Sequence, residues 1–125
     1  MSGEGRLILV VDDQFAVLAS VAMRLRRAGY RTIEATSGPE AIAILETRSA
    51  DISVVLADCD MAPMRGSELA RVVLTRWAEI GYVAMSGMPR DPDLPDEVSF
   101  IGKPAQITVL VAVIEAAISD VTSRD

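Results

Sequence analysis

Short apolar runs alternate along this chain with longer segments in which apolar residues recur every three or four positions. The short runs are typical of strands buried in a parallel sheet, and the longer spacing is typical of amphipathic helices. The predicted strands are residues 7–11, 30–35, 52–57, 82–85 and 100–102. Because a helical segment is expected after each strand, the pattern predicts five strands alternating with five helices.

Capping residues and prolines indicate where the helices begin and end. Gly29 is placed to end the first helix, and Ser-Gly-Pro-Glu at residues 37–40 forms a capping box that opens the second. The helices expected from these signals and from the spacing span residues 15–28, 38–47, 67–78 and 106–118. Residues 87–95 contain three prolines, so the fourth of the five helices should be short or displaced.

This order of elements predicts an α/β fold. Strands that alternate with helices are joined by right-handed crossovers into a parallel sheet covered on both faces. We therefore expect a doubly wound five-stranded parallel sheet in a three-layer αβα sandwich. A chain of 125 residues supports one hydrophobic core. The expectation is one domain over residues 1–125, with its core at about residues 6–121 and no output domain.

Composition and charge narrow the function classes. Half of the residues are hydrophobic and the charged residues are interspersed, which indicates a soluble globular protein. A net charge of -6 without a basic run argues against nucleic-acid binding. The chain has no apolar stretch long enough to cross a membrane and no segment that resembles a signal peptide. We therefore expect a cytoplasmic protein without a membrane partner.

Cysteine and histidine usage restricts the chemistry further. The single cysteine, Cys59, permits no disulfide within the chain, and the chain has no histidine. A Ser-His-Asp triad is excluded, and any metal would have to be held by oxygen ligands.

Polar side chains follow four of the predicted strands at their carboxyl ends. Asp12 and Asp13 come after the first strand, Asp58 after the third, Ser86 after the fourth and Lys103 after the fifth. In an open parallel sheet this edge is where ligands bind. These five side chains therefore predict one polar site.

The residue types at this edge suit phosphoryl transfer. Three carboxylates repel one another and need a counter-charge, which a hard cation such as Mg²⁺ provides. A carboxylate can also attack phosphorus and form an aspartyl phosphate, and Asp58, on the middle strand, is placed as this nucleophile. Asp12 and Asp13 are placed to hold Mg²⁺. Lys103 and Ser86 are placed to bind phosphoryl oxygens.

The motifs, taken in order, resemble the receiver domain of bacterial response regulators. They are Val-Asp-Asp at residues 11–13, Asp-x-x-Met at 58–61 with a glycine eight residues after the aspartate, a serine at a strand end, and Lys-Pro. The resemblance covers residues 7–118, includes single-domain receivers and receivers of hybrid histidine kinases, and implies a flavodoxin-like receiver fold. It implies a role in two-component signal transduction and phosphorelay. A histidine kinase or histidine phosphotransfer protein would pass a phosphoryl group to Asp58 with Mg²⁺, or with Mn²⁺ in its place.

The resemblance also implies metal ligands. Asp13 and Asp58 resemble the direct carboxylate ligands, whereas Asp12 acts mainly through water. The backbone carbonyl of Asp60 resembles the third ligand from the protein.

A second group resembles the switch of the family. Ser86 and Phe100 resemble the switch pair, in which the hydroxyl moves to the phosphoryl group and the ring turns inward. The bond between Lys103 and Pro104 resembles the family's cis bond, which would aim the lysine into the site.

The resemblance also implies where a downstream protein binds. It is expected to bind the face of the fourth helix, fifth strand and last helix, about residues 87–118.

The loop after Asp58 departs from the family pattern. The proline usual four residues after the phosphoacceptor is replaced by Ala62 and stands one place late, at Pro63, so we expect a reshaped loop. Asp60 adds a negative charge that would affect how fast water reaches the phosphoryl group. Arg65 stands where many receivers have a small or acidic residue.

Simpler roles stay open for the individual residues. Asp12 and Asp13 also suit a helix N-cap, Lys103 a solvated surface, Ser86 an ordinary turn and Phe100 the core.

Two other functions stay open. A pseudo-receiver would bind partners without being phosphorylated. A metal-dependent phosphatase would use Asp58 and Asp60, but the motif order is the reverse of that in haloacid-dehalogenase enzymes and no cap domain is present. We expect a phosphoacceptor with autodephosphorylation at most, rather than an enzyme that turns over.

Overall fold

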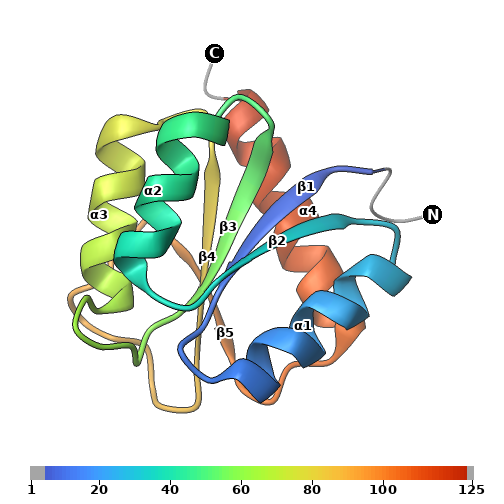
Figure 1. Ribbon diagram of the computed structural model, residues 1–125, viewed down its shortest axis with the longest axis horizontal. Coiled ribbons are helices and arrows are strands. Elements are labelled where there is room, and N and C mark those ends of the chain that lie inside the picture. Colours follow the sequence, from blue (N-terminus) through green and yellow to red (C-terminus); the bar gives the residue numbers. More distant parts are fainter. Residues whose placement is uncertain (1–4, 124–125) are drawn as a thin grey trace.

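Five parallel strands form the centre of the computed structural model, which describes residues 5–123 (Figure 1). The strands are β1 (Leu7–Val11), β2 (Arg31–Ala35), β3 (Ile52–Asp58), β4 (Gly81–Ser86) and β5 (Ser99–Gly102). Their order in the sheet is β2-β1-β3-β4-β5, and each neighbouring pair is parallel. The chain therefore reverses direction across the sheet after β2, which confirms the doubly wound prediction.

Within the described residues, helices cover both faces of this sheet. They are α1 (Phe15–Arg27), α2 (Gly38–Arg48), α3 (Gly66–Arg76) and α4 (Ile107–Ser123). Figure 1 shows α2 and α3 together on one face, and α1 and α4 on the other. The three-layer αβα prediction is confirmed. Between residues 5 and 123, no helix combines the length and the apolar character needed to span a bilayer.

Strand β1 shows why the strands have continuous apolar runs. Its side chains alternate between two cores: Leu7, Leu9 and Val11 pack beneath α2 and α3, whereas Ile8 and Val10 pack beneath α1 and α4. All five residues are at most 3 % exposed. Since both faces of the strand are covered, every position has to be apolar.

The helix ends follow the predicted capping signals closely. Gly29 has a φ of 100°, a conformation that glycine adopts without steric cost, directly after α1 and its C-cap. Before α2, the Ser37 hydroxyl accepts the N–H of Glu40 at 3.2 Å. The Glu40 carboxylate accepts the N–H of Thr36 at 2.6 Å, one residue earlier than in an ideal capping box. The last helix, α4, continues beyond the predicted end at residue 118 to Ser123.

The predicted fourth helix is absent, so the expectation of five helices is wrong. Residues 87–98, all within the described part of the chain, form turns and bends between β4 and β5. Three prolines at three-residue intervals remove backbone donors and prevent a regular helical turn. Side chains hold the segment instead. Arg90 donates to the carbonyls of Pro95 at 2.8 Å and Val98 at 3.0 Å, while Leu94 is buried in the core beneath α3.

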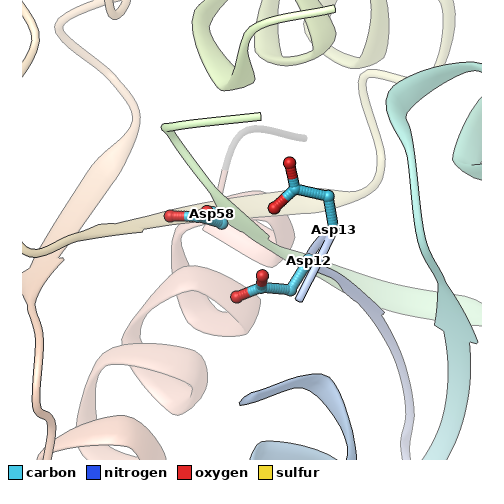
Figure 2. Close-up of side chains that lie close together, drawn as sticks. All are labelled: Asp12, Asp13 and Asp58. Atoms are coloured by element: carbon cyan, nitrogen blue, oxygen red, sulfur yellow. The ribbon is translucent and has the colours of Figure 1, made fainter. Parts of the chain in front are cut away.

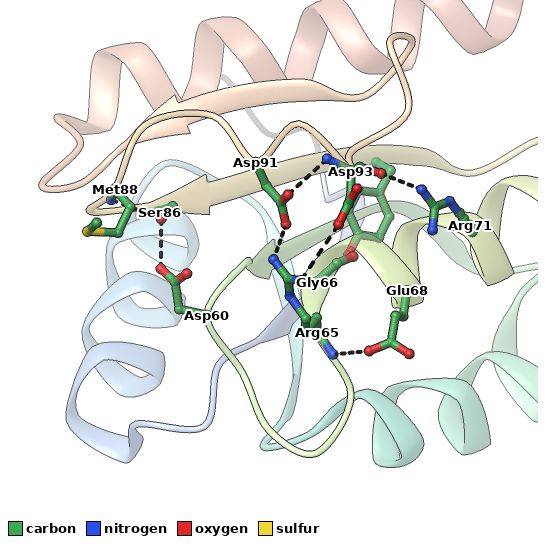
Figure 3. Close-up of polar contacts among 10 residues, drawn as sticks. Asp60, Arg65, Gly66, Glu68, Arg71, Ser86, Met88, Asp91 and Asp93 are labelled. Atoms are coloured by element: carbon green, nitrogen blue, oxygen red, sulfur yellow. Dashed lines mark hydrogen bonds and ion pairs between the residues drawn. The ribbon is translucent and has the colours of Figure 1, made fainter.

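Two arginines outside this segment attach it to the region around α3 (Figure 3). Arg65, directly before α3, lies 2.8 Å from the Asp91 carboxylate and 3.7 Å from that of Asp93. Arg71, on α3, donates to the Asp93 carbonyl at 2.7 Å. The expected face for a downstream protein therefore consists of β5, α4 and an arginine-held loop, without a helix between β4 and β5.

Gly66 allows α3 to begin against the end of β3. A Cβ atom at this position would lie 2.7 Å from the Asp58 carbonyl oxygen and 2.7 Å from Cys59 Cα, closer than real side chains approach backbone. The carbonyl of Gly66 accepts a hydrogen bond from the buried Tyr82 hydroxyl at 3.1 Å. The glycine spacing noted in the sequence thus has a steric reason.

Replacement of Gly66 by alanine is expected to lower the free energy of unfolding by about 1–3 kcal/mol, because backbone atoms have to move to admit the methyl group. Urea denaturation followed by circular dichroism measures the change. The control is Gly87→Ala, where an added Cβ meets nothing within 4 Å, and its stability should stay within about 0.5 kcal/mol of the wild type. Equal stability of the two variants would contradict the steric explanation.

Candidate functional site

Three carboxylates meet at the carboxyl edge of the sheet (Figure 2). Asp12 and Asp13 follow β1, Asp58 ends β3, and the pairing of Val11 with Ala57 places the two strand ends side by side. One oxygen from each carboxylate lies within 4.8 Å of the other two. Asp12 and Asp58 are buried and Asp13 is exposed, so the cluster opens to solvent on one side.

Lys103 connects two of these carboxylates. Its ammonium group lies 3.1 Å from Asp12 Oδ2 and 3.2 Å from Asp58 Oδ1. The backbone places it there: the N–H of Lys103 donates to the Ser86 carbonyl at 2.8 Å. The Lys103–Pro104 peptide is cis, as predicted. The structure thus brings together the acids and the lysine that the sequence singled out.

Burial and charge act in opposite directions in this cluster. Burial raises the pKa of Asp58, and although Lys103 lowers it, the pKa stays above the ordinary aspartate value. Burial also lowers the pKa of Lys103, but its contacts with Asp12 and Asp58 outweigh burial and raise that pKa. Lys103 is therefore an ammonium ion at neutral pH. The Lys103 ammonium carries one positive charge, whereas the cluster contains three carboxylates, so the site can accept a further cation.

The donor set fits a hard divalent cation. Asp58 Oδ1 is buried and, among the described residues, has no hydrogen-bond partner, so it is held only by the charge of Lys103. Oxygen-only ligation with few carboxylates matches the preference of Mg²⁺. The side chains that would hold the ion are Asp12, Asp13 and Asp58. The backbone carbonyl of Asp60 stays a prediction.

Ser86 lies at the end of β4, as expected, but its hydroxyl is bonded elsewhere. It donates to Asp60 Oδ2 at 2.7 Å and accepts the N–H of Met88 at 3.0 Å. No sequence pattern indicates the Asp60 partner, because the two residues are 26 positions apart, with Ser86 at the end of β4 and Asp60 in the loop after β3.

Phe100 lies on β5, half-buried against the core beneath α2 and α3. This packing agrees with the simpler core role, and a switch role for the ring stays a prediction. Two further features of the loop after Asp58 were also outside the sequence prediction, and its expected reshaping relative to the family stays a prediction. The Ala62–Pro63 peptide is cis, and Arg65 pairs with Asp91 across 26 residues.

Comparison with known proteins points to one family. A family model described as "Response regulator receiver domain" matches residues 8–115. The sensor kinase CckA of Brucella abortus is 29% identical over 113 residues, covering 86% of this chain but 12% of that protein. The virulence sensor protein BvgS of Bordetella pertussis is 39% identical over 75 residues, covering 60% of the chain and 6% of BvgS. The chain thus spans a small fraction of the curated relatives it matches.

Solved structures show the same likeness. The receiver domain of the hybrid histidine kinase CckA is 30% identical with a TM-score of 0.74, and the match covers 90% of this chain and 98% of that one. A response regulator receiver domain protein from Clostridium thermocellum has a TM-score of 0.86 at 22% identity, covering 95% of this chain and 98% of that one. The second match supports the fold alone.

Cys59 should be slow to react in the native protein. It is 3 % exposed, and burial, together with the nearby charges of Asp60 and Asp58, raises the pKa of its thiol from 9.0 to about 11. The native thiolate fraction near neutral pH is then about a hundredfold below that of an ordinary cysteine, before access is considered. The measurement compares the rate of alkylation by iodoacetamide in buffer with the rate in denaturant, and mass spectrometry detects the alkylated protein. An alkylation rate in buffer close to the rate in denaturant would contradict this prediction, because it would show that the reagent reaches the thiol in the folded protein.

Proposed function

Because the chain belongs to the response regulator receiver domain family, we propose that it accepts a phosphoryl group on Asp58 and thereby changes which protein it binds. The donor would be a histidine kinase or a histidine phosphotransfer protein of a two-component system. One observation carries the proposal. The buried Asp58 Oδ1 lies 3.2 Å from the Lys103 ammonium, within a cluster of carboxylates that fits a divalent cation.

In the transfer step, an oxygen of the Asp58 carboxylate bonds to phosphorus while the bond from phosphorus to the donor's imidazole nitrogen breaks. Lys103, 3.2 Å from Asp58 Oδ1, is placed to pair with a phosphoryl oxygen as negative charge builds up there. When bound, Mg²⁺ would supply positive charge that offsets the repulsion between the carboxylates and the incoming group. Asp12 and Asp13 would hold the cation beside Asp58.

We propose an acceptor rather than an enzyme that turns over. A phosphatase would use Asp58 and Asp60, but the order of the acidic motifs along this chain is the reverse of that in haloacid-dehalogenase enzymes. Loss of the phosphoryl group to water would then be autodephosphorylation of the same aspartate.

The downstream protein would recognise the side of the molecule next to the site. In the segment of residues 87–118 two large apolar side chains are exposed: Met88, in the loop after β4, is 65% exposed, and Val109, on α4, is 44% exposed. Both lie within the segment proposed from the sequence, although the helix expected between β4 and β5 is absent. Recognition would therefore involve a loop held by Arg65, together with β5 and α4.

Wild-type protein with Mg²⁺ and acetyl phosphate should gain one phosphoryl group, and Asp58→Asn should gain none, because the amide lacks the nucleophilic oxygen. Intact-protein mass spectrometry measures the product. The control, Asp51→Asn, removes an exposed carboxylate that pairs with Arg48 before β3, and should be modified like the wild type. Modification of Asp58→Asn, or none in the wild type with either acetyl phosphate or a kinase, would contradict the proposal.

Mg²⁺ should stabilise the folded protein through the same carboxylates. A ligand at a hundred times its Kd adds about 2.7 kcal/mol to the free energy of unfolding. At a concentration that saturates the wild type, Asp13→Asn should lose most of the rise in Tm, whereas Asp51→Asn should keep it. Differential scanning fluorimetry measures the shifts. An equal rise in Tm for both variants would place the cation elsewhere.

A further inference from the structure

The hydroxyl of Ser86 has already used its single donor proton. Its proton goes to Asp60 Oδ2 at 2.7 Å, and its oxygen accepts the backbone N–H of Met88 at 3.0 Å (Figure 3). A serine hydroxyl has one proton to donate. While it is bonded to Asp60, Ser86 has no donor for a phosphoryl oxygen on Asp58.

We propose that the Asp60 side chain is a positioning residue that holds Ser86 in the unphosphorylated state. This proposal rests on the proposed phosphorylation of Asp58. When the phosphoryl group is attached, the hydrogen bond from Ser86 to the Asp60 carboxylate breaks, and the hydroxyl donates to a phosphoryl oxygen instead. The exchange transfers no proton and uses no other reactant.

The burial of the two partners gives the exchange its direction. Ser86 is 2 % exposed, so its hydroxyl needs an acceptor within the protein, whereas Asp60 is exposed and its carboxylate can be solvated by water. A phosphoryl group adds about 1.5–2 negative charges two residues before Asp60 and provides strong acceptor oxygens. It therefore repels the present acceptor and offers another to the same hydroxyl.

The loop after β3 holds the segment after β4 at two points. Asp60 holds Ser86, and five residues later Arg65 holds Asp91 at 2.8 Å. Between these points, Met88 donates its N–H to the Ser86 oxygen and is 65% exposed. Release of Ser86 from Asp60 therefore changes the environment of Met88 directly, while the Arg65 ion pair limits how far the change extends.

The test compares Asp60→Ala, which removes the acceptor, with Asp60→Asn, which removes the charge but keeps an acceptor oxygen. Each is titrated with beryllium fluoride in saturating Mg²⁺, and the amide resonance of Met88 is followed by NMR.

Asp60→Ala should lower the half-saturating concentration of beryllium fluoride by about three- to tenfold, which corresponds to the contribution of one hydrogen bond to an exposed carboxylate. Asp60→Asn should lie nearer the wild type. Before any beryllium fluoride is added, the Met88 resonance of Asp60→Ala should already lie closer to its saturated position.

A double-mutant cycle with Ser86→Ala separates the hydrogen bond from the charge. If Asp60 acts through Ser86, the effect of Asp60→Ala disappears in the Ser86→Ala background. Asp96→Asn is the charge control, since it removes an exposed carboxylate from the same β4–β5 segment, and it should titrate like the wild type.

The outcomes distinguish the two proposals. Equal effects of Asp60→Ala and Asp60→Asn that persist in the Ser86→Ala background would overturn the positioning role and leave phosphorylation of Asp58 intact. The positioning role would also be overturned if the wild type and Asp60→Ala bound beryllium fluoride with the same half-saturating concentration. A wild type that binds no beryllium fluoride overturns the proposed function and the positioning role together.

Discussion

The charge balance at the carboxyl edge of the sheet is the constraint on which the site depends. Two buried carboxylates, Asp12 and Asp58, share one ammonium group, that of Lys103. Lys103 can reach both because its strand ends beside β4 and its own N–H is fixed to the carbonyl of Ser86. The fold therefore keeps an anionic site only partly neutralised. A divalent cation would supply the positive charge that the site lacks, and it would also offset part of the negative charge that a phosphoryl group adds.

The β4–β5 segment shows how a missing helix is replaced. A helix would satisfy its backbone groups internally, whereas here arginine side chains bind backbone carbonyls at Asp93, Pro95 and Val98. Two of the buried residues in the segment, Leu94 and Val98, fix it to the core. The result is a loop whose course depends on guanidinium groups and carboxylates at the surface. Its conformation should therefore respond to salt more than that of a helix would.

The fold was predictable because its signals are local. The apolar runs of β1 and β3, the Ser37 cap and Gly29 each determine their element without reference to distant residues. The acids and Lys103 were also predictable, because parallel strands end at one edge. By contrast, the Ser86–Asp60 and Arg65–Asp91 contacts each join residues 26 positions apart, and pair formation depends on loop geometry that periodicity does not encode. Prolines predicted an irregular fourth helix, but the absence of the helix also depends on the arginines that replace it.

Gly66 divides this side of the molecule into a fixed part and an exchangeable part. The start of α3 lies directly against the backbone of Asp58 and Cys59 and accepts a hydrogen bond from Tyr82, so it is packed tightly against β3 and β4. Residues 60–65 form the loop between Cys59 and Gly66, and this packing fixes both ends of the loop. Met61 of this loop is buried in the core and Met64 packs against it. The other four residues, Asp60, Ala62, Pro63 and Arg65, are exposed and can be replaced without repacking the core. Substitutions at these four exposed positions would therefore alter the surroundings of the site while leaving the acidic cluster and Lys103 in place.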